Sequence, residues 1–179
     1  MSLQEKYKKE VIKALKTEFG LKNDLSVPRV TKALVTVGLS SKNKDPKLVE
    51  TVENTLLRIT GQRPAKTAAK KSISNFKIRK GMTVGFMVTL RGHRMYDFLD
   101  KLVNLTLPRV RDFRGLPRKS VDHKGNLSIG FREHVAFPEI RPDEVERLHG
   151  LGITVVTNAK SREKGLALFA GLGFPFAAK

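Results

Sequence analysis

The stretch "MTVGFMVTLRG", residues Met82–Gly92, carries the clearest secondary-structure signal in the chain. Its residues alternate between an apolar set and a mixed set. The apolar set is Met82, Val84, Phe86, Val88 and Leu90, and the other set is Thr83, Gly85, Met87, Thr89 and Arg91. This period of two predicts a β-strand with one face in the core and the other face open.

Further strands are expected over residues 27–38, 126–132 and 152–158. The first of these stretches is rich in β-branched residues and has Pro28 near its start. In the first of them, Ala33, Val35 and Val37 share one face. The other face carries Val30, Lys32, Leu34 and Thr36, so its polar members project from the opposite side of the sheet.

Helical spacing of apolar residues surrounds these strands. Helices are expected over residues 2–20, 45–61, 93–107, from 142, and over 161–173. Ser2 and Glu5 form a capping box, Asp45 is a plausible N-cap before Pro46, and Pro108 is expected to stop the third helix. Helices and strands mix without regular βαβ alternation. We therefore predict an α+β fold with two layers, in which helices cover one face of a largely antiparallel sheet. Residues 1–179 are expected to form one domain, from which a long basic loop protrudes.

The charge balance indicates the kind of partner. The 179 residues include 35 Lys and Arg against 17 Asp and Glu, a net charge of +18. Such an excess repels itself, and a polyanion would remove that repulsion. Nucleic acid is favoured over an anionic membrane surface, because no apolar run approaches the roughly 18 residues needed to span and no signal-peptide core is expected. The absence of cysteine excludes disulfides and thiolate sites and suits the cytoplasm.

The excess charge is concentrated in "KTAAKKSISNFKIRKG", residues 66–81, which has six cations and no acid. A solvated surface loop is one interpretation of this segment. The favoured one is a contact with a phosphate backbone, from which each cation can displace a counterion. Phe76, preceded by Asn75, could stack on a base or anchor the segment to the protein body.

Two other clusters have alternative interpretations. Four arginines lie close together in sequence, and their guanidinium groups could form bidentate contacts with phosphate. They are Arg109, Arg111, Arg114 and Arg118. Alternatively, this is an ordinary surface loop in which Asp112 pairs with one of them. Acidic residues gather at Glu133, Glu139, Asp143, Glu144 and Glu146. Asp143 and Glu144 could complement a helix N-terminus, or the cluster could face a basic protein partner.

Catalysis has little support. His93, His123, His134 and His149 lack metal-ligand spacing, and no serine lies in a nucleophile-elbow pattern. We expect no enzyme, no metal and no cofactor. The chain has no Trp, two Tyr and ten Phe mostly at core spacing, so it lacks the aromatic platforms of single-strand binders. A folded RNA read by shape, phosphates and 2′-hydroxyls is the better fit.

Several segments together resemble a known family. They are "VPRV", "GQRP", "KKSISNFKIRKG", "VTLRG", "LPRVRDFRGL", "GNLSIGFRE", "FPEI" and "GFPF", in this order and over nearly the whole chain. They are similar to bacterial ribosomal protein five of the large subunit. The resemblance implies a non-enzymatic protein of the ribosome's central protuberance in the cytoplasm. Its implied partners are 5S rRNA, 23S rRNA, P-site tRNA, small-subunit protein thirteen and neighbouring 5S-rRNA-binding proteins, with no membrane.

The resemblance also assigns residues. The implied 5S-rRNA face comprises Lys32, Thr36, Gln62, Thr89 and Arg91. The implied tRNA-contacting loop comprises Lys66, Lys70, Lys71, Ser72, Asn75, Phe76, Lys77, Arg79 and Lys80. Other rRNA contacts fall on Arg109, Arg111 and Arg114, and the intersubunit protein contact on Glu139, Arg141, Asp143 and Glu144. Thr36 stands where the family usually has Asn, so its contact is expected to be shortened or water-mediated. The alternatives are a regulatory RNA-binding module outside ribosomes and an RNA-modifying enzyme.

Overall fold

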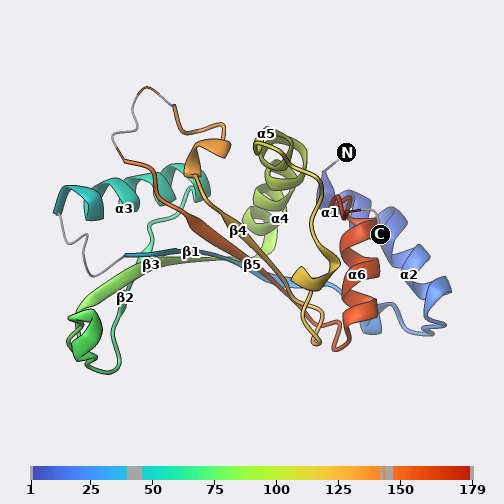
Figure 1. Ribbon diagram of the computed structural model, residues 1–179. Helices are drawn as coiled ribbons and strands as arrows, with labels where there is room; N and C mark the ends of the chain where they lie inside the picture. Colours follow the sequence, from blue (N-terminus) through green and yellow to red (C-terminus); the bar gives the residue numbers. More distant parts are fainter. Residues whose placement is uncertain (1, 40–45, 142, 144–146, 178–179) are drawn as a thin grey trace. The chain divides into compact units, whose positions relative to one another are not determined.

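The computed structural model describes residues 2–39, 46–141, 143 and 147–177. Five strands form one antiparallel sheet in the order β2-β3-β1-β5-β4 (Figure 1). The strands are β1 (Val30–Gly38), β2 (Ala65–Ala68), β3 (Thr83–Leu90), β4 (Leu127–Phe131) and β5 (Leu151–Thr157). The α+β fold predicted from the alternating pattern is therefore confirmed.

The helices follow the predicted segments, except that helical structure continues through Pro108 to Arg109, because the proline stands in the first turn of a new short helix, where its missing N–H costs no hydrogen bond. They are α1 (Leu3–Lys6), α2 (Ile12–Glu18), α3 (Pro46–Thr60), α4 (Gly92–Lys101), α5 (Leu107–Arg109) and α6 (Arg162–Gly171). A π-helical turn, Tyr7–Val11, joins α1 to α2, and another, Leu102–Thr106, joins α4 to α5. The predicted capping box is present, with the Ser2 and Glu5 side chains each bonded to the other's backbone N–H. Asp45 and most of the helix expected from residue 142 lie outside the described residues.

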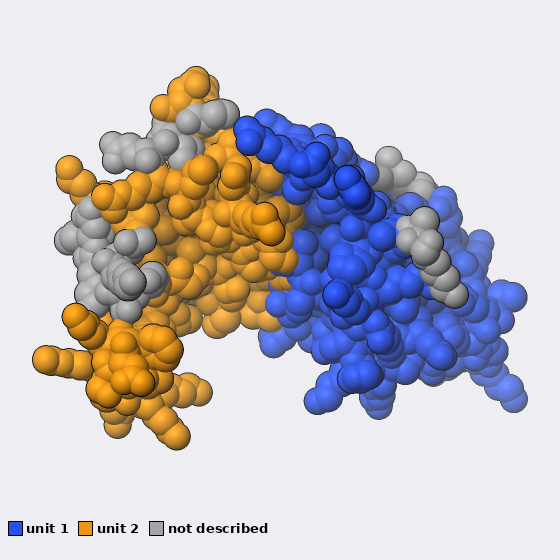
Figure 2. All heavy atoms as spheres, in the orientation of Figure 1, with its two compact units in different colours: residues 1–33, 90–129, 154–179 blue, residues 34–89, 130–153 orange. Residues whose placement is uncertain are grey.

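The chain divides into two compact units, coloured separately in Figure 2. The first unit comprises residues 1–33, 90–129 and 154–179, and the second comprises residues 34–89 and 130–153. Four of the strands, β1, β3, β4 and β5, have residues in both units. That residues 1–179 act as one domain stays a prediction.

Helices build the core of the first unit. The helical segment 3–18 packs against α4 and α6, with Leu3, Val11, Leu15, Leu99 and Phe169 buried. The backbone of α6 approaches the backbone of the 122–126 turn most closely at two glycines. A Cβ added to Gly165 of α6 would lie only 2.6 Å from the Cα of Gly125. Two glycines therefore let the 122–126 turn lie directly against the helix.

In the second unit, α3 lies over one face of the strands (Figure 1). Its apolar stripe of Leu48, Val52, Leu56 and Ile59 is buried, as are Val35, Val37, Phe86 and Val88 from the strands. Burial of alternate residues on β1 and β3 confirms the predicted strand faces. Val30 departs from this pattern, since it is only 5% exposed although it shares a face with Thr36. Its end of β1 lies in the first unit, next to Pro28, whose carbonyl accepts a hydrogen bond from the Tyr7 hydroxyl.

The segment expected as a long loop, residues 66–81, is an ordered hairpin for much of its length. Its first residues belong to β2, which pairs antiparallel with β3 so that Lys66 lies opposite Phe86. The sequence "AKTA" of β2 has a weak intrinsic preference for the strand conformation. It is a strand here because its backbone forms hydrogen bonds with β3. Residues 66–68 are therefore part of a strand rather than of the expected basic loop, and the protrusion of the segment stays a prediction.

Candidate nucleic-acid interface

Three neutral residues of the candidate RNA face lie in the second unit. Thr36 is exposed, while Gln62 and Thr89 are half-buried. The Gln62 side-chain N–H₂ donates to the Thr89 carbonyl at 3.5 Å, so the structure brings these two residues together from α3's end and from β3. The hydroxyl of Thr89 and the amide oxygen of Gln62 form no hydrogen bond among the described residues and can meet a ligand.

Thr36 is positioned by its neighbour strand. Its hydroxyl donates to the Gly152 carbonyl at 3.3 Å, and a Cβ on Gly152 would lie 3.1 Å from that hydroxyl oxygen. The hydroxyl therefore already has one partner, and its lone pairs remain to accept from a ligand. This arrangement suits the shortened or water-mediated contact expected where Asn is usual.

Lys32 and Arg91 belong to the first unit. Lys32 is half-buried on β1, and Arg91 is the exposed N-cap residue of α4. Neither forms an ion pair within the described part of the chain. A cation without a local acid keeps its full attraction for phosphate, so both remain candidates for an RNA contact.

The basic hairpin, Lys66–Gly81, is held by backbone hydrogen bonds. Ala69 and Gly81 are joined at 2.9 Å, and Ile73 and Ile78 form a two-bond bridge. The Ser72 hydroxyl accepts from the Lys80 N–H at 3.0 Å, so Ser72 fixes the hairpin backbone. The order of this segment means that its cations are presented on a framework rather than on a random chain.

The six cations of the basic hairpin are Lys66, Lys70, Lys71, Lys77, Arg79 and Lys80, and all of them are exposed. None is in an ion pair among the residues that the structure describes. Figure 2 shows long side chains radiating from this part of the second unit. Such an array cannot neutralise itself, and its repulsion would be relieved by an external polyanion.

Phe76 lies at the tip of the basic hairpin, and its exposure distinguishes the two roles considered for it, stacking on a base and anchoring the segment. A 3-10 turn, Ser74–Phe76, leaves the Phe76 ring 61% exposed, with Asn75 beside it also exposed. A ring that anchored the segment would be buried, so the anchoring interpretation is excluded. A hollow lined by Ser72, Ser74, Lys77, Ile78, Arg79 and Met82 lies on the same hairpin.

The arginine loop also points outward. Arg109, Arg111 and Arg114 are exposed, and no ion pair joins any of them to Asp112 within the described residues. Asp112 instead takes a left-handed conformation with φ of 53°. The loop is fixed at Leu116, whose N–H donates to the Pro175 carbonyl at 2.7 Å and whose carbonyl accepts from the Ala177 N–H at 2.9 Å.

The acidic cluster lies partly outside the described residues, because Glu144 and Glu146 are not among them. Glu139 is half-buried, while Arg141 and Asp143 are exposed. Phe137 anchors this segment in the second unit, fully buried with its ring 5.6 Å from that of Phe131.

Sequence reasoning missed two features. The first is Arg29, an exposed cation whose backbone is held on both sides by Asn158: its N–H donates to the Asn158 side-chain oxygen at 2.6 Å, and its carbonyl accepts from the Asn158 N–H at 3.2 Å. A cation directly after Pro28, within the strand predicted over residues 27–38, was the available signal. The second is the contact of His134 with His149, which no spacing rule indicates.

Two tyrosines of the first unit, Tyr7 and Tyr96, have shifted pKa values and interact electrostatically with Arg29. Burial raises the pKa of Tyr7 to about 12, and Tyr96 adds to this while the Arg29 cation opposes it. Burial likewise raises the pKa of Tyr96. Both phenols therefore stay neutral at physiological pH, and the positive charge of Arg29 is left uncompensated.

The described residues offer neither a metal site nor a membrane span. Within residues 2–39, 46–141, 143 and 147–177, no group of three or more His, Asp or Glu could hold a metal ion. Nor does any helix in those ranges have the length and apolar character to cross a bilayer.

Comparisons with known proteins cover nearly the whole chain. A family model described as "Ribosomal protein L5" matches residues 23–79, and the model of the ribosomal L5 family C-terminus matches residues 83–176. Among similar proteins, "Large ribosomal subunit protein uL5" of Halothermothrix orenii is 52% identical over 174 residues, covering 97% of each chain. The protein of the same name from Fervidobacterium nodosum is 53% identical over 174 residues, covering 97% of this chain and 95% of its own. That of Chloroflexus aurantiacus is 50% identical over 97% of each chain.

Proposed function

Because the chain belongs to the uL5 family of large-subunit ribosomal proteins, we propose that it is a structural constituent of the large subunit that binds 5S rRNA. The observation that carries this proposal is the contact of the Gln62 side chain with the Thr89 backbone, at the end of β3. Neutral donors and acceptors in fixed positions can read 2′-hydroxyls and base edges. Lys32 and Arg91 add the phosphate attraction that any RNA contact needs.

The basic hairpin serves a different RNA in this proposal. Its six cations and exposed Phe76 form a projecting array suited to P-site tRNA. A ring exposed among cations can stack on a base or ribose while the cations bind the adjoining phosphates. Separate surfaces allow one protein to hold 5S rRNA and to touch a tRNA that enters and leaves.

Two further contacts complete the proposal. Arg109, Arg111 and Arg114 face 23S rRNA, because their guanidinium groups are exposed and unpaired by Asp112. The segment of Glu139, Arg141, Asp143 and Glu144 meets small-subunit protein thirteen, for which its acidic character is suited. Neighbouring 5S-rRNA-binding proteins adjoin the chain in the ribosome of the cytoplasm, and the chain has no enzymatic role.

Two experiments test this function. Filter binding of the purified protein across salt concentrations should show tight, salt-dependent binding to 5S rRNA and weaker binding to poly-U. Equal affinity for both RNAs would contradict recognition of a folded RNA. Sucrose-gradient fractionation should place the chain with large subunits at near-equal stoichiometry, whereas a regulatory module or an RNA-modifying enzyme would stay mainly at the top of the gradient.

A further inference from the structure

The last residue of α3, Thr60, has a hydroxyl that contacts the backbone on both sides of the helix end. Its oxygen lies 2.7 Å from the Leu56 carbonyl oxygen and 3.1 Å from the Gln62 carbonyl oxygen, and it can donate to either of them. The same oxygen accepts from the Gln62 N–H at 3.3 Å. Both backbone polar groups of Gln62 therefore meet the Thr60 side chain.

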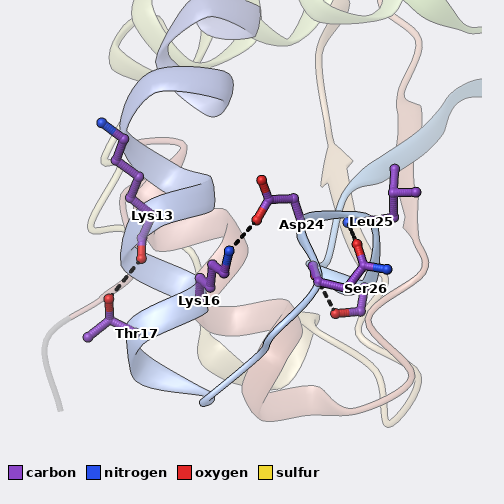
Figure 3. Close-up of polar contacts among 7 residues, drawn as sticks. Lys13, Lys16, Thr17, Asp24, Leu25 and Ser26 are labelled. Atoms are coloured by element: carbon purple, nitrogen blue, oxygen red, sulfur yellow. Dashed lines mark hydrogen bonds and ion pairs between the residues drawn. The ribbon is translucent and has the colours of Figure 1, made fainter.

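Other helical threonines make only the bond to the preceding turn. Thr17 of α2 donates to the Lys13 carbonyl at 3.1 Å (Figure 3). Thr55 of α3 likewise donates to the carbonyl four residues earlier, at 2.8 Å. Within the described part of the chain, neither hydroxyl bonds to a residue beyond its own helix. A bond to the preceding turn is common for threonine, so the distinctive feature of Thr60 is its contact with Gln62.

The contact matters because a glycine separates the two residues. Gly61 has a φ of 65°, and its N–H donates to the Leu57 carbonyl at 2.8 Å, which ends the helix. Glycine restricts the backbone less than any other residue, so Gly61 does not by itself fix the direction of the following chain. The side-chain bond from Gln62 to Thr89 is long, at 3.5 Å, and is too weak to fix it alone. The Thr60 hydroxyl spans the glycine and holds Gln62 in place.

The residues after Gln62 leave geometry as the main property of this end of the candidate RNA face. The Arg63 Nε donates to a carboxylate oxygen of Glu53 at 3.0 Å, so the nearest cation already has an acidic partner. Pro64 follows and is buried, so the chain returns to the core directly after Gln62 and Arg63. What the Gln62 amide can recognise therefore depends on where its backbone is held.

We propose that Thr60 is a positioning residue for the recognition of 5S rRNA. Its hydroxyl holds the Gln62 backbone so that the Gln62 amide meets the RNA in one orientation, and Thr60 itself makes no contact with the RNA. Binding then loses less conformational entropy, because Gln62 is ordered before the RNA arrives. This inference rests on the proposed function and adds to it the residue that sets the geometry of the Gln62 contact.

The test measures filter binding of 5S rRNA to Thr60→Val, Thr60→Ser and the unchanged protein. Thr60→Val keeps the side-chain shape and removes the hydroxyl, so binding should weaken roughly fivefold with an unchanged salt slope, the scale of one side chain that must be ordered on binding. Thr60→Ser keeps the hydroxyl and should retain most of the affinity. The matched control is Thr55→Val, which removes an equivalent bond within the same helix and should leave the affinity unchanged.

Two further measurements separate positioning from a general loss of stability. If Thr60 acts through Gln62, Thr60→Val should have little further effect on 5S rRNA binding in a protein that already carries Gln62→Ala. In the free protein, amide hydrogen exchange at Gln62 should be roughly fivefold faster in Thr60→Val, because its N–H loses its acceptor, and should stay normal in Thr60→Ser.

Several outcomes would overturn the positioning role while the proposed function stands. They are unchanged affinity in Thr60→Val, a loss in Thr60→Ser as large as in Thr60→Val, and an equal effect of Thr60→Val with and without Gln62→Ala. Tight binding by Gln62→Ala would overturn it as well, because there would be no Gln62 contact to position. If the unchanged protein does not bind 5S rRNA, the proposed function fails and this inference fails with it.

Discussion

The imidazole rings of His134 and His149 are stacked, with their centroids 3.9 Å apart and their planes 6° from parallel. Nδ1 of His134 lies 3.3 Å from the backbone nitrogen of His149 and 3.2 Å from its carbonyl oxygen, so it accepts from the N–H or donates to the carbonyl according to its tautomer. Burial and the neighbouring His134 lower the pKa of His149 to about 4. Burial also lowers the pKa of His134. The folded protein therefore favours two neutral imidazoles in this position.

The stack predicts an acid-sensitive second unit. When a histidine's pKa is lower in the folded state, the unfolded state takes up protons first as the pH falls. The stack's contribution to stability is full above the usual histidine pKa of about 6.5 and is lost as the pH falls towards about 4. Urea unfolding at several pH values should show His149→Phe losing less stability over this window than the unchanged protein. The exposed His93→Gln serves as the control, and an identical pH dependence in His149→Phe would contradict the prediction.

Gln62 and Thr89 are expected to supply geometry more than charge. Replacing either with Ala should weaken 5S rRNA binding by about 1–2 kcal/mol without changing the salt slope, because the variant removes a neutral hydrogen bond and leaves every phosphate contact in place. Gln62→Glu should weaken binding further by facing RNA with a negative charge. Gln4→Ala on α1 is the control, and a changed slope with unchanged affinity would refute the role assigned to Gln62.

The basic hairpin is expected to act on tRNA rather than on 5S rRNA. The test variant combines Lys70→Ala, Lys71→Ala and Lys80→Ala with Lys77→Asn, since the φ of 51° at residue 77 suits Asn better than Ala. Folding and isolated 5S rRNA binding should change little, because these charges lie outside the core. The salt slope of tRNA association with reconstituted ribosomes should fall by roughly one for each lysine–phosphate pair that the variant removes, and P-site affinity should fall with it.

A charge-matched control separates local from general effects of the hairpin variant. Changing the exposed lysines Lys8, Lys9, Lys13 and Lys119 to Ala removes the same charge elsewhere and should leave P-site tRNA affinity nearly unchanged. Collapse of 5S rRNA binding in the hairpin variant, with normal tRNA binding, would mean that the hairpin is the main 5S rRNA clamp and that its assignment to tRNA is wrong.

Close packing of α6 predicts that Gly165→Ala is destabilising. The added Cβ would lie 2.6 Å from the Cα of Gly125 and 2.8 Å from its carbonyl oxygen, and backbone atoms cannot move aside as a flexible side chain can. We expect a loss of about 1–3 kcal/mol in the free energy of unfolding. Gly130→Ala, where nothing lies within 4 Å of the added Cβ, should be nearly neutral. Thermal unfolding of the two variants provides the comparison.

Thr106 is buried in the π-helical turn Leu102–Thr106, and its hydroxyl has no hydrogen-bond partner among the described residues. Thr106→Val keeps the shape and removes the unsatisfied group, so the protein should gain about 1 kcal/mol of stability. Thr106→Ala should destabilise, because it leaves a small cavity. Denaturant unfolding measures both, and a clear loss of stability in Thr106→Val would show that the hydroxyl is bonded after all.

Local features of this protein could be predicted from its sequence because they depend on neighbouring residues. The strand faces around Phe86 follow from alternation, the first helix from the Ser2 and Glu5 capping box, and the end of α3 from Gly61. The charge excess likewise requires no structure, since it depends only on composition. These signals were sufficient for the α+β class and for choosing RNA as the partner.

Other features were decided by residues that meet only in the folded chain. β2 has weak intrinsic preference and forms because β3 offers it a hydrogen-bonding edge. The burial of Val30, the contact of Gln62 with Thr89 and the approach of Gly165 to Gly125 each join segments distant in sequence. No periodicity encodes such pairings, because each depends on how whole elements pack. The sequence by itself determined the elements and the charge, whereas tertiary packing decided which polar groups were left exposed for the proposed contacts with RNA.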